Sequence, residues 1–134
     1  TGLPAPLHRE ELAAMLAKLG ATVLREVTQP GVMAVFRLAI TEAQRAPEVA
    51  ATLDTARASI RIAVHDLVAQ AQASGMLAAG DPREMSARYL ALLWGDLMVS
   101  LLLRLREAPK PKECEQRGGQ AAADFLRLYP AARR

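Results

Sequence analysis

The stretch that decides the fold covers residues 82–106 and reads PREMSARYLALLWGDLMVSLLLRLR. It has a strong helix start, because Asp81 supplies a capping side chain and Pro82 suits the first helical position. Glu84 places an acid in the first turn, where it complements the helix dipole. The next proline is Pro109, so we predict one long helix over 82–106.

This predicted helix is apolar on nearly every side. Between Tyr89 and Leu105 the strongly polar residues are Asp96, Ser100 and Arg104. A helix of that kind needs cover on nearly every side. A chain of 134 residues has difficulty covering one long helix near its C-terminal end. We therefore expect a second copy of the chain to provide part of the cover.

Prolines and glycines divide the rest of the chain into further helices. Apolar residues recur every three or four positions from Leu12 onward, which is helical spacing. Hydrophobic residues make up 51% of the chain and aromatic residues 4%, a composition that favours helix over sheet. We predict one all-α domain over residues 1–134, an antiparallel bundle of about six helices. The expected ranges are about 8–27, 30–44, 47–54, 55–74, 82–106 and 112–129.

Composition and charge favour a cytoplasmic protein. Cys114 is the single cysteine, which excludes an internal disulfide and fits a reducing compartment. No apolar run approaches the roughly 18 residues of a membrane span, and the first residues lack the pattern of a signal peptide, so we expect no membrane partner. The last 31 residues carry eight Lys or Arg against four Asp or Glu. Because the two signs are interspersed, we interpret this segment as a solvated surface.

The sequence offers no pattern typical of a catalytic or metal site. Its two histidines, His8 and His65, fall on different predicted helices, and no His, Cys and acidic residues have metal-ligand spacing. Gly118-Gly119 lies in a helical pattern without the Lys-Ser/Thr of a phosphate loop. We therefore expect neither an enzyme nor a bound metal or cofactor.

Three motifs resemble the C-terminal domain of TetR/AcrR-type transcriptional repressors. FRLAITEA at 36–43, followed by PEVA at 47–50, is similar to the family's R-L-x-x-x-E-A and P-E-L-A stretches. YLALLWGDL at 89–97 is similar to its F-L-x-L-L-x-G-D-L stretch, and AADFLRLY at 122–129 to its closing F-L-x-x-Y signature. The order and spacing of the motifs also agree with the family.

The resemblance implies a function. It implies an effector-binding and dimerisation domain in a helical bundle of the TetR type, in which the last two long helices pair in a symmetric homodimer. It also implies a pocket for a small apolar or amphipathic effector, whose binding controls operator DNA binding by an N-terminal helix-turn-helix. The present sequence would begin at the family's fourth helix, so operator DNA would be bound only through that preceding domain.

The pocket is expected where the inward stripes of several helices meet. Methionine and phenylalanine recur on these stripes, and flexible thioethers suit a promiscuous apolar site. The predicted wall residues are Met15, Met33, Phe36, Ile40, Val64, Leu67, Leu93, Trp94, Asp96 and Leu97.

Asp96 has two interpretations, because a buried carboxylate needs a partner. It either reads a polar group of the effector or has a structural role. In the structural role it pairs with Arg37 or Arg104, or it caps a neighbouring chain.

The dimer interface is expected on the helix over 82–106 and on the last helix, where small residues allow two helices to approach closely. Its predicted residues are Ala91, Gly95, Val99, Leu102, Gly118, Ala121, Ala122 and Phe125. An alternative of a different class remains open, in which the chain is a free-standing helical dimerisation or adaptor module that docks a partner helix.

Overall fold

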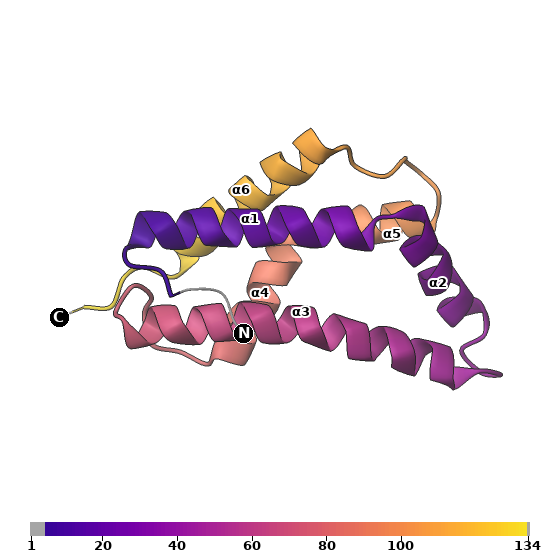
Figure 1. The fold of residues 1–134 in the computed structure, drawn as a ribbon, viewed down its shortest axis with the longest axis horizontal. Coiled ribbons are helices and arrows are strands. Elements are labelled where there is room, and N and C mark those ends of the chain that lie inside the picture. Colours follow the sequence, from indigo (N-terminus) through magenta and orange to yellow (C-terminus); the bar gives the residue numbers. More distant parts are fainter. Residues whose placement is uncertain (1–4, 134) are drawn as a thin grey trace.

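The predicted all-α fold is confirmed by a computed structural model that describes residues 5–133. Within this range there are six helices and no strand (Figure 1). The helices are α1 (Arg9–Val27), α2 (Pro30–Thr41), α3 (Pro47–Ala73), α4 (Pro82–Trp94), α5 (Leu97–Leu102) and α6 (Pro111–Leu128).

The helices cross at several angles and pack on one common core (Figure 1). α3 runs antiparallel to α1, α2 joins the two at one end, and α4 crosses between them (Figure 1). α6 packs along α1 on the side away from α3 and also contacts α4. The core side chains between these helices are largely aliphatic, with Tyr89 and Phe125 as the two large aromatic exceptions.

Prolines set the helix starts. Pro30, Pro47, Pro82 and Pro111 each occupy the first turn of a helix, where a missing N–H leaves no hydrogen bond unmade. At α4 the predicted cap is present, since the carboxylate of Asp81 accepts a hydrogen bond from the N–H of Arg83 at 2.9 Å. These starts agree with the sequence prediction to within a residue.

Several predicted helix limits are wrong, among them the expected end at Arg106, since α5 ends at Leu102. The separate helices at 47–54 and 55–74 are one helix, α3, because nothing at Asp54 and Thr55 interrupts it and the Thr55 hydroxyl donates back to the carbonyl of Ala51. The helix over 82–106 is broken into α4 and α5 at Gly95, whose φ of 49° and ψ of −125° are not helical. α2 ends at Thr41 instead of Gln44.

α1 and α6 cross at two glycines. A Cβ on Gly118 would overlap the carbonyl oxygen of Ala17 and lie 2.9 Å from the nitrogen of Ala21. On the α1 side, a Cβ on Gly20 would lie 2.5 Å from the hydroxyl oxygen of Tyr89. That hydroxyl donates to the carbonyl of Leu16 at 2.5 Å, and burial raises the pKa of Tyr89. The two helices can therefore be this close only without side chains at the crossing.

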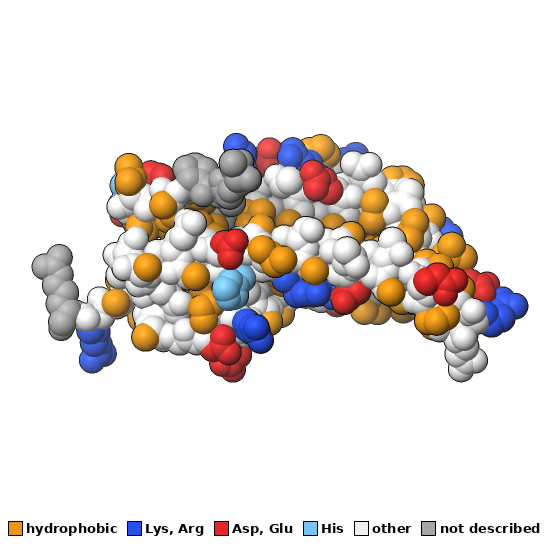
Figure 2. All heavy atoms as spheres, turned by 60° about the horizontal axis from the view of Figure 1, so that its bottom comes forward, with side chains coloured by type: hydrophobic (Ala, Val, Ile, Leu, Met, Phe, Trp, Pro, Cys, Tyr) orange, Lys and Arg blue, Asp and Glu red, His pale blue; other side chains and the backbone are white. Residues whose placement is uncertain are grey.

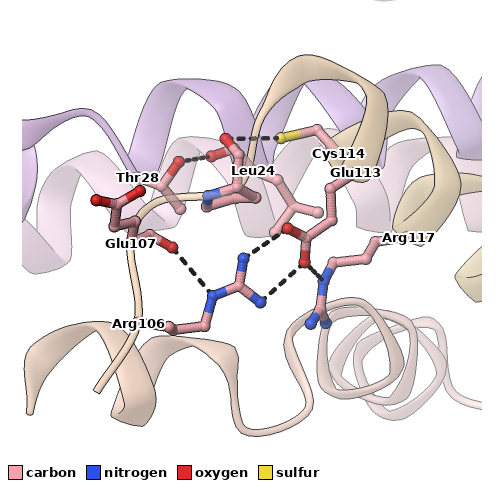
Figure 3. Close-up of polar contacts among 8 residues, drawn as sticks. Leu24, Thr28, Arg106, Glu107, Glu113, Cys114 and Arg117 are labelled. Atoms are coloured by element: carbon pink, nitrogen blue, oxygen red, sulfur yellow. Dashed lines mark hydrogen bonds and ion pairs between the residues drawn. The ribbon is translucent and has the colours of Figure 1, made fainter. Parts of the chain in front are cut away.

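Ion pairs fix the segment between α5 and α6. The guanidinium of Arg106 donates to both oxygens of Glu113, at 2.5 and 2.9 Å, and Arg117 donates to the same carboxylate at 2.9 Å (Figure 3). Arg106 also donates to the carbonyl of Glu107 at 3.0 Å. These two guanidinium groups lower the pKa of Glu113 to about 2.

Arg37 and Arg9 donate hydrogen bonds to backbone carbonyls at or just beyond the ends of other helices. Arg37 on α2 donates to the carbonyls of Leu101 and Leu102, at 2.7 and 3.4 Å, at the C-terminal end of α5. Arg9 at the start of α1 donates to the carbonyls of Met76, Leu126 and Tyr129. Such bonds satisfy carbonyls that a helix end or a turn leaves without a partner.

Candidate functional site

The candidate site is a cleft of about 370 Å³ to which five helices contribute. It opens between α1, α2 and α3 on one side and α4 and α5 on the other. Its lining residues are Val23, Val27, Phe36, Arg57, Ile60, Arg61, Leu90, Trp94, Met98 and Leu102. Most of this lining is apolar, and the charged groups in it are two arginines of α3.

The break between α4 and α5 shapes one wall of the cleft. Trp94 is the last residue of α4, and the chain turns at Gly95 before α5 begins. Met98 and Leu102 lie one turn apart on α5 and line the same cleft as Trp94. The cleft therefore borders the chain on both sides of this break.

The polar edge of the cleft is on α3. Arg57 and Arg61 lie one helical turn apart, and the Nη1 atom of each contacts the same oxygen of Asp54, at 3.5 and 3.4 Å. Their side chains are 58% and 46% exposed, so they lie at the mouth of the cleft and not in its interior. One carboxylate thus holds two guanidinium groups beside an apolar cavity.

A second cleft of about 490 Å³ adjoins the first between α3 and α4. Arg61 and Leu90 line both clefts. The second one also has His65, whose Nδ1 lies 3.4 Å from a carboxylate oxygen of Asp66, and Arg83 at the start of α4. Figure 2 looks onto the α3 side and shows basic side chains, a histidine and acidic side chains interspersed among apolar and neutral atoms.

Two of the predicted pocket residues, Phe36 and Trp94, line the cleft. Met33, Val64, Leu67, Leu93 and Leu97 are instead buried in the core, and Met15 packs against that core while partly exposed. Ile40 lies outside on α2 with 62% of its surface exposed. Five of the predicted wall residues therefore face inward, but they fill the core and do not border the cavity.

The interpretation of Asp96 as a buried carboxylate is wrong. Asp96 is exposed at the break between α4 and α5, and it does not line the cleft. Arg37, proposed as its partner, binds backbone carbonyls of α5. Arg104 lies two residues beyond the end of α5, where its φ is 57°, and no ion pair joins it to Asp96. Because the helix is interrupted at Gly95, Asp96 needs no buried partner.

The predicted interface residues divide into two groups. Gly118, Ala121, Ala122 and Phe125 are buried within one chain, where α6 packs on α1, so the small-residue stripe serves a contact inside the chain and not between chains. Ala91, Gly95 and Val99 are exposed on α4 and α5, and Leu102 lines the cleft.

Several cleft residues were not predicted. Arg57 and Arg61 are two of them, although their spacing of four on a helix, with Ile60 between them, indicates a position at the edge of an apolar surface. Val23, Val27 and Leu90 line the cleft as well and were not among the predicted wall residues.

Two further classes of site are absent from residues 5–133. No helix in this range is long and apolar enough to cross a membrane. In the same range, no three His, Cys, Asp or Glu side chains come together as a metal ion would require.

Comparison with protein families gives one match that covers most of the chain. Residues 14–131 match a family described as the C-terminal domain of AefR-like transcriptional repressors. A comparison with curated proteins finds no relative of the chain.

Solved structures with the same fold include three regulators. A TetR transcriptional regulator from Agrobacterium tumefaciens has a TM-score of 0.80 and 26% identity, over 96% of this chain and 65% of that one. A TetR-family regulator from Mesorhizobium loti has a TM-score of 0.75 and 15% identity, over 92% and 66%. The flavonoid-responsive regulator FrrA has a TM-score of 0.72 and 22% identity, over 96% and 65%. The chain therefore spans 65 to 66% of the length of these regulators.

Proposed function

The chain belongs to the AefR-like transcriptional repressors of the TetR family, as their C-terminal domain, and we propose that it binds a small apolar or amphipathic effector in the cleft between α1 and α5. In the complete regulator, a cytoplasmic protein, binding would control operator DNA binding by an N-terminal helix-turn-helix. The alternative, a free-standing adaptor that docks a partner helix, is not supported by the match to a repressor domain.

The cleft is the observation that carries this proposal. Its volume of about 370 Å³ falls within the range of small-molecule pockets, and its walls come from helices that are far apart in the sequence. An apolar compound of moderate size would contact Phe36, Trp94 and Met98 together. One solved structure with the same fold is a flavonoid-responsive regulator, and flavonoids are compounds of this size and character.

α1 offers a route from the cleft to a preceding domain. Val23 and Val27 line the cleft near the C-terminal end of α1, and Arg9 fixes the other end of the helix to the turn after α3 and to α6. A compound that moves the Val23 end would therefore tilt a helix held at its start. A helix-turn-helix joined to α1 would move with it, which changes its fit to an operator.

The cleft is tested with the fluorescence of Trp94, the single tryptophan of the chain. A panel of flavonoids and related aromatic compounds is titrated into the protein while emission and melting temperature are recorded. A compound that occupies the cleft is expected to quench or shift the emission and to raise the melting temperature, because it binds only the folded state.

Matched variants make the test specific to the cleft. Val27→Phe adds volume to the cleft wall, whereas Val35→Phe makes the same change at an exposed site of α2. Val27→Phe is expected to abolish the response and Val35→Phe to keep it. If no compound changes Trp94 emission, or if both variants respond like the parent, the proposed effector site is wrong.

We further propose a homodimer through the exposed side of α4 and α5 together with α6. Ala91, Gly95 and Val99 are exposed on this side, as is Leu92 with 38% of its surface. Small residues allow a second α4 to approach, and the exposed Val99 and Leu92 would supply the apolar contact.

A further inference from the structure

We propose that the effector is an amphipathic anion whose acid group is bound by Arg57 and Arg61 at the mouth of the cleft. The inference rests on the proposed function, because it assumes that the cleft takes a small molecule. It adds the chemical class of that molecule: an apolar body that carries a carboxylate, sulfonate or similar acid.

The charge of the two adjoining clefts supports this class. The lining of the first contains Arg57 and Arg61, and the lining of the second contains Arg61, Arg83 and His65. Neither lining contains an aspartate or a glutamate. Arg61 belongs to both, so it lies where the clefts meet. Asp54 pairs with Arg57 and Arg61, and Asp66 lies beside His65. Both carboxylates stand outside the linings, so the charged groups that face the cavity are cationic. Such a lining favours anionic ligands over cationic ones.

The geometry leaves both guanidinium groups able to bind another acid. Each uses one nitrogen, Nη1, for Asp54, and these contacts are long, at 3.5 and 3.4 Å. A guanidinium has five N–H donors in a planar fork that matches a carboxylate or sulfonate. Asp54 thus holds the two side chains on one face of α3 and occupies only part of their donors.

The other cleft residues fit the apolar part of such a ligand. Trp94, Phe36 and Met98 offer an aromatic and thioether lining, while Arg57 and Arg61 remain about half exposed at the opening. An acid group left at this opening keeps part of its hydration, so binding does not require a charge to be buried. The volume of about 370 Å³ suits a compound the size of two or three fused or linked rings.

The test compares two probes that differ in one acid group. Anilinonaphthalene sulfonate is an anion, and phenylnaphthylamine is the same aromatic body without the sulfonate. Binding is followed by energy transfer from Trp94, the single tryptophan, and loss of the transfer in Val27→Phe but not in Val35→Phe assigns it to this cleft. We expect the anion to bind at least about tenfold more tightly than the neutral probe, with an affinity that falls as salt is added.

Three variants separate the acid site from the apolar cleft. Arg61→Gln is expected to weaken binding of the sulfonate about tenfold and to leave the neutral probe unchanged. Asp54→Asn removes the competing carboxylate and is expected to tighten sulfonate binding about twofold or more. Arg45→Gln, at an exposed arginine paired with Glu42 beyond α2, is the control and should change neither probe. Melting curves confirm that each variant is folded, because the anionic probe also binds loosened states.

The outcomes distinguish the inference from the proposed function. If both probes accept energy from Trp94 with equal affinity, or if Arg61→Gln weakens both equally, the cleft binds small molecules but the acid site is wrong. If neither probe accepts energy from Trp94 and no compound raises the melting temperature, both the cleft and the acid site are wrong. A selective loss of the sulfonate in Arg61→Gln, with a gain in Asp54→Asn, supports the inference.

Discussion

Gly118 sets how closely α6 packs on α1. A Cβ there would overlap the carbonyl oxygen of Ala17, which is backbone and cannot turn aside. We predict that Gly118→Ala lowers the free energy of unfolding by about 1–3 kcal/mol, the range for overpacking, as measured by urea denaturation. The neighbouring Gly119 has open space around its Cα, so Gly119→Ala is expected to be neutral or to stabilise by up to about 1 kcal/mol. Equal stability of the two variants would contradict a tight crossing.

Tyr89 tests whether the buried hydroxyl holds α4 to α1. The hydroxyl donates to the carbonyl of Leu16 and the side chain has no exposed surface. Tyr89→Phe removes this bond and keeps the ring packed edge-on against Phe125, so we predict a loss of about 1 kcal/mol in the free energy of unfolding. Tyr129→Phe is the control: its hydroxyl bonds Arg88 at the surface, and its removal should change stability by less than about 0.5 kcal/mol. If Tyr129→Phe loses more stability than Tyr89→Phe, the buried hydroxyl does not hold α4 to α1 as predicted.

At the scale of the helices, Glu113 at the start of α6 makes the free energy of unfolding depend on pH. Its pKa is lowered from 4.5 to about 2 by Arg106 and Arg117, so folding favours the ionised form. Stability from this group is complete above pH 4.5 and is lost as the pH falls from about 4.5 to about 2. Since the side chain is about one third exposed, we expect a contribution of about 1 kcal/mol.

The variant Glu113→Gln measures that contribution. At pH 7 it is expected to be less stable than the parent, and the difference should shrink toward zero as the pH is lowered to about 2. Urea denaturation at a series of pH values gives both curves. A difference that does not change with pH would show that the amide disturbs packing and that the ion pairs contribute nothing measurable.

Helix starts and ends could be predicted from the sequence where neighbouring residues determine them, but not where tertiary packing does. Asp81 and Pro82 mark the start of α4 by a cap and a fixed φ, which are properties of neighbouring residues. The break at Gly95 has no such signal, because a glycine inside an apolar run is compatible with a continuing helix. In α3 the sequence suggests a boundary where the helix continues, because Asp54 and Thr55 are residues that often cap helices. Here Asp54 forms ion pairs with arginines of the same helix, and the Thr55 hydroxyl donates to the carbonyl of Ala51 one turn earlier.

The cleft was less predictable than the helices, since it depends on how five of them are placed. Periodicity correctly identified inward-facing residues such as Val64 and Leu93, but it does not distinguish a core position from a cavity wall. That distinction depends on tertiary placement, including the turn at Gly95, which lies between the cleft residues Trp94 and Met98. The roles of Arg57 and Arg61 also appear only in three dimensions, because a charged helical stripe looks the same beside solvent and beside an apolar cleft.

At the scale of the whole molecule, the exposed side of α4 and α5 predicts a dimer. Val99 has 57% of its surface exposed, and Ala91 and Gly95 beside it on the preceding turns are small. A stable two-fold interface buries about 1,600 Å² in total, and a charge placed in its centre without a partner weakens it strongly. We predict that the parent chain sediments as a dimer at micromolar concentration and that Val99→Glu sediments as a monomer.

The choice of variant decides whether this experiment tests the interface or only folding. Gly95 has a φ of 49°, so any side chain there strains the backbone, and a monomeric Gly95 variant would have two explanations. Val99 is helical and exposed, so glutamate fits in one chain without strain. Val35→Glu makes the same change on exposed α2 and should remain a dimer.

The melting temperature of the parent and of Val35→Glu should rise with protein concentration, as for any dimer that unfolds to monomers, whereas that of Val99→Glu should not. A monomeric parent, or a dimeric Val99→Glu, would place the contact between chains on another face.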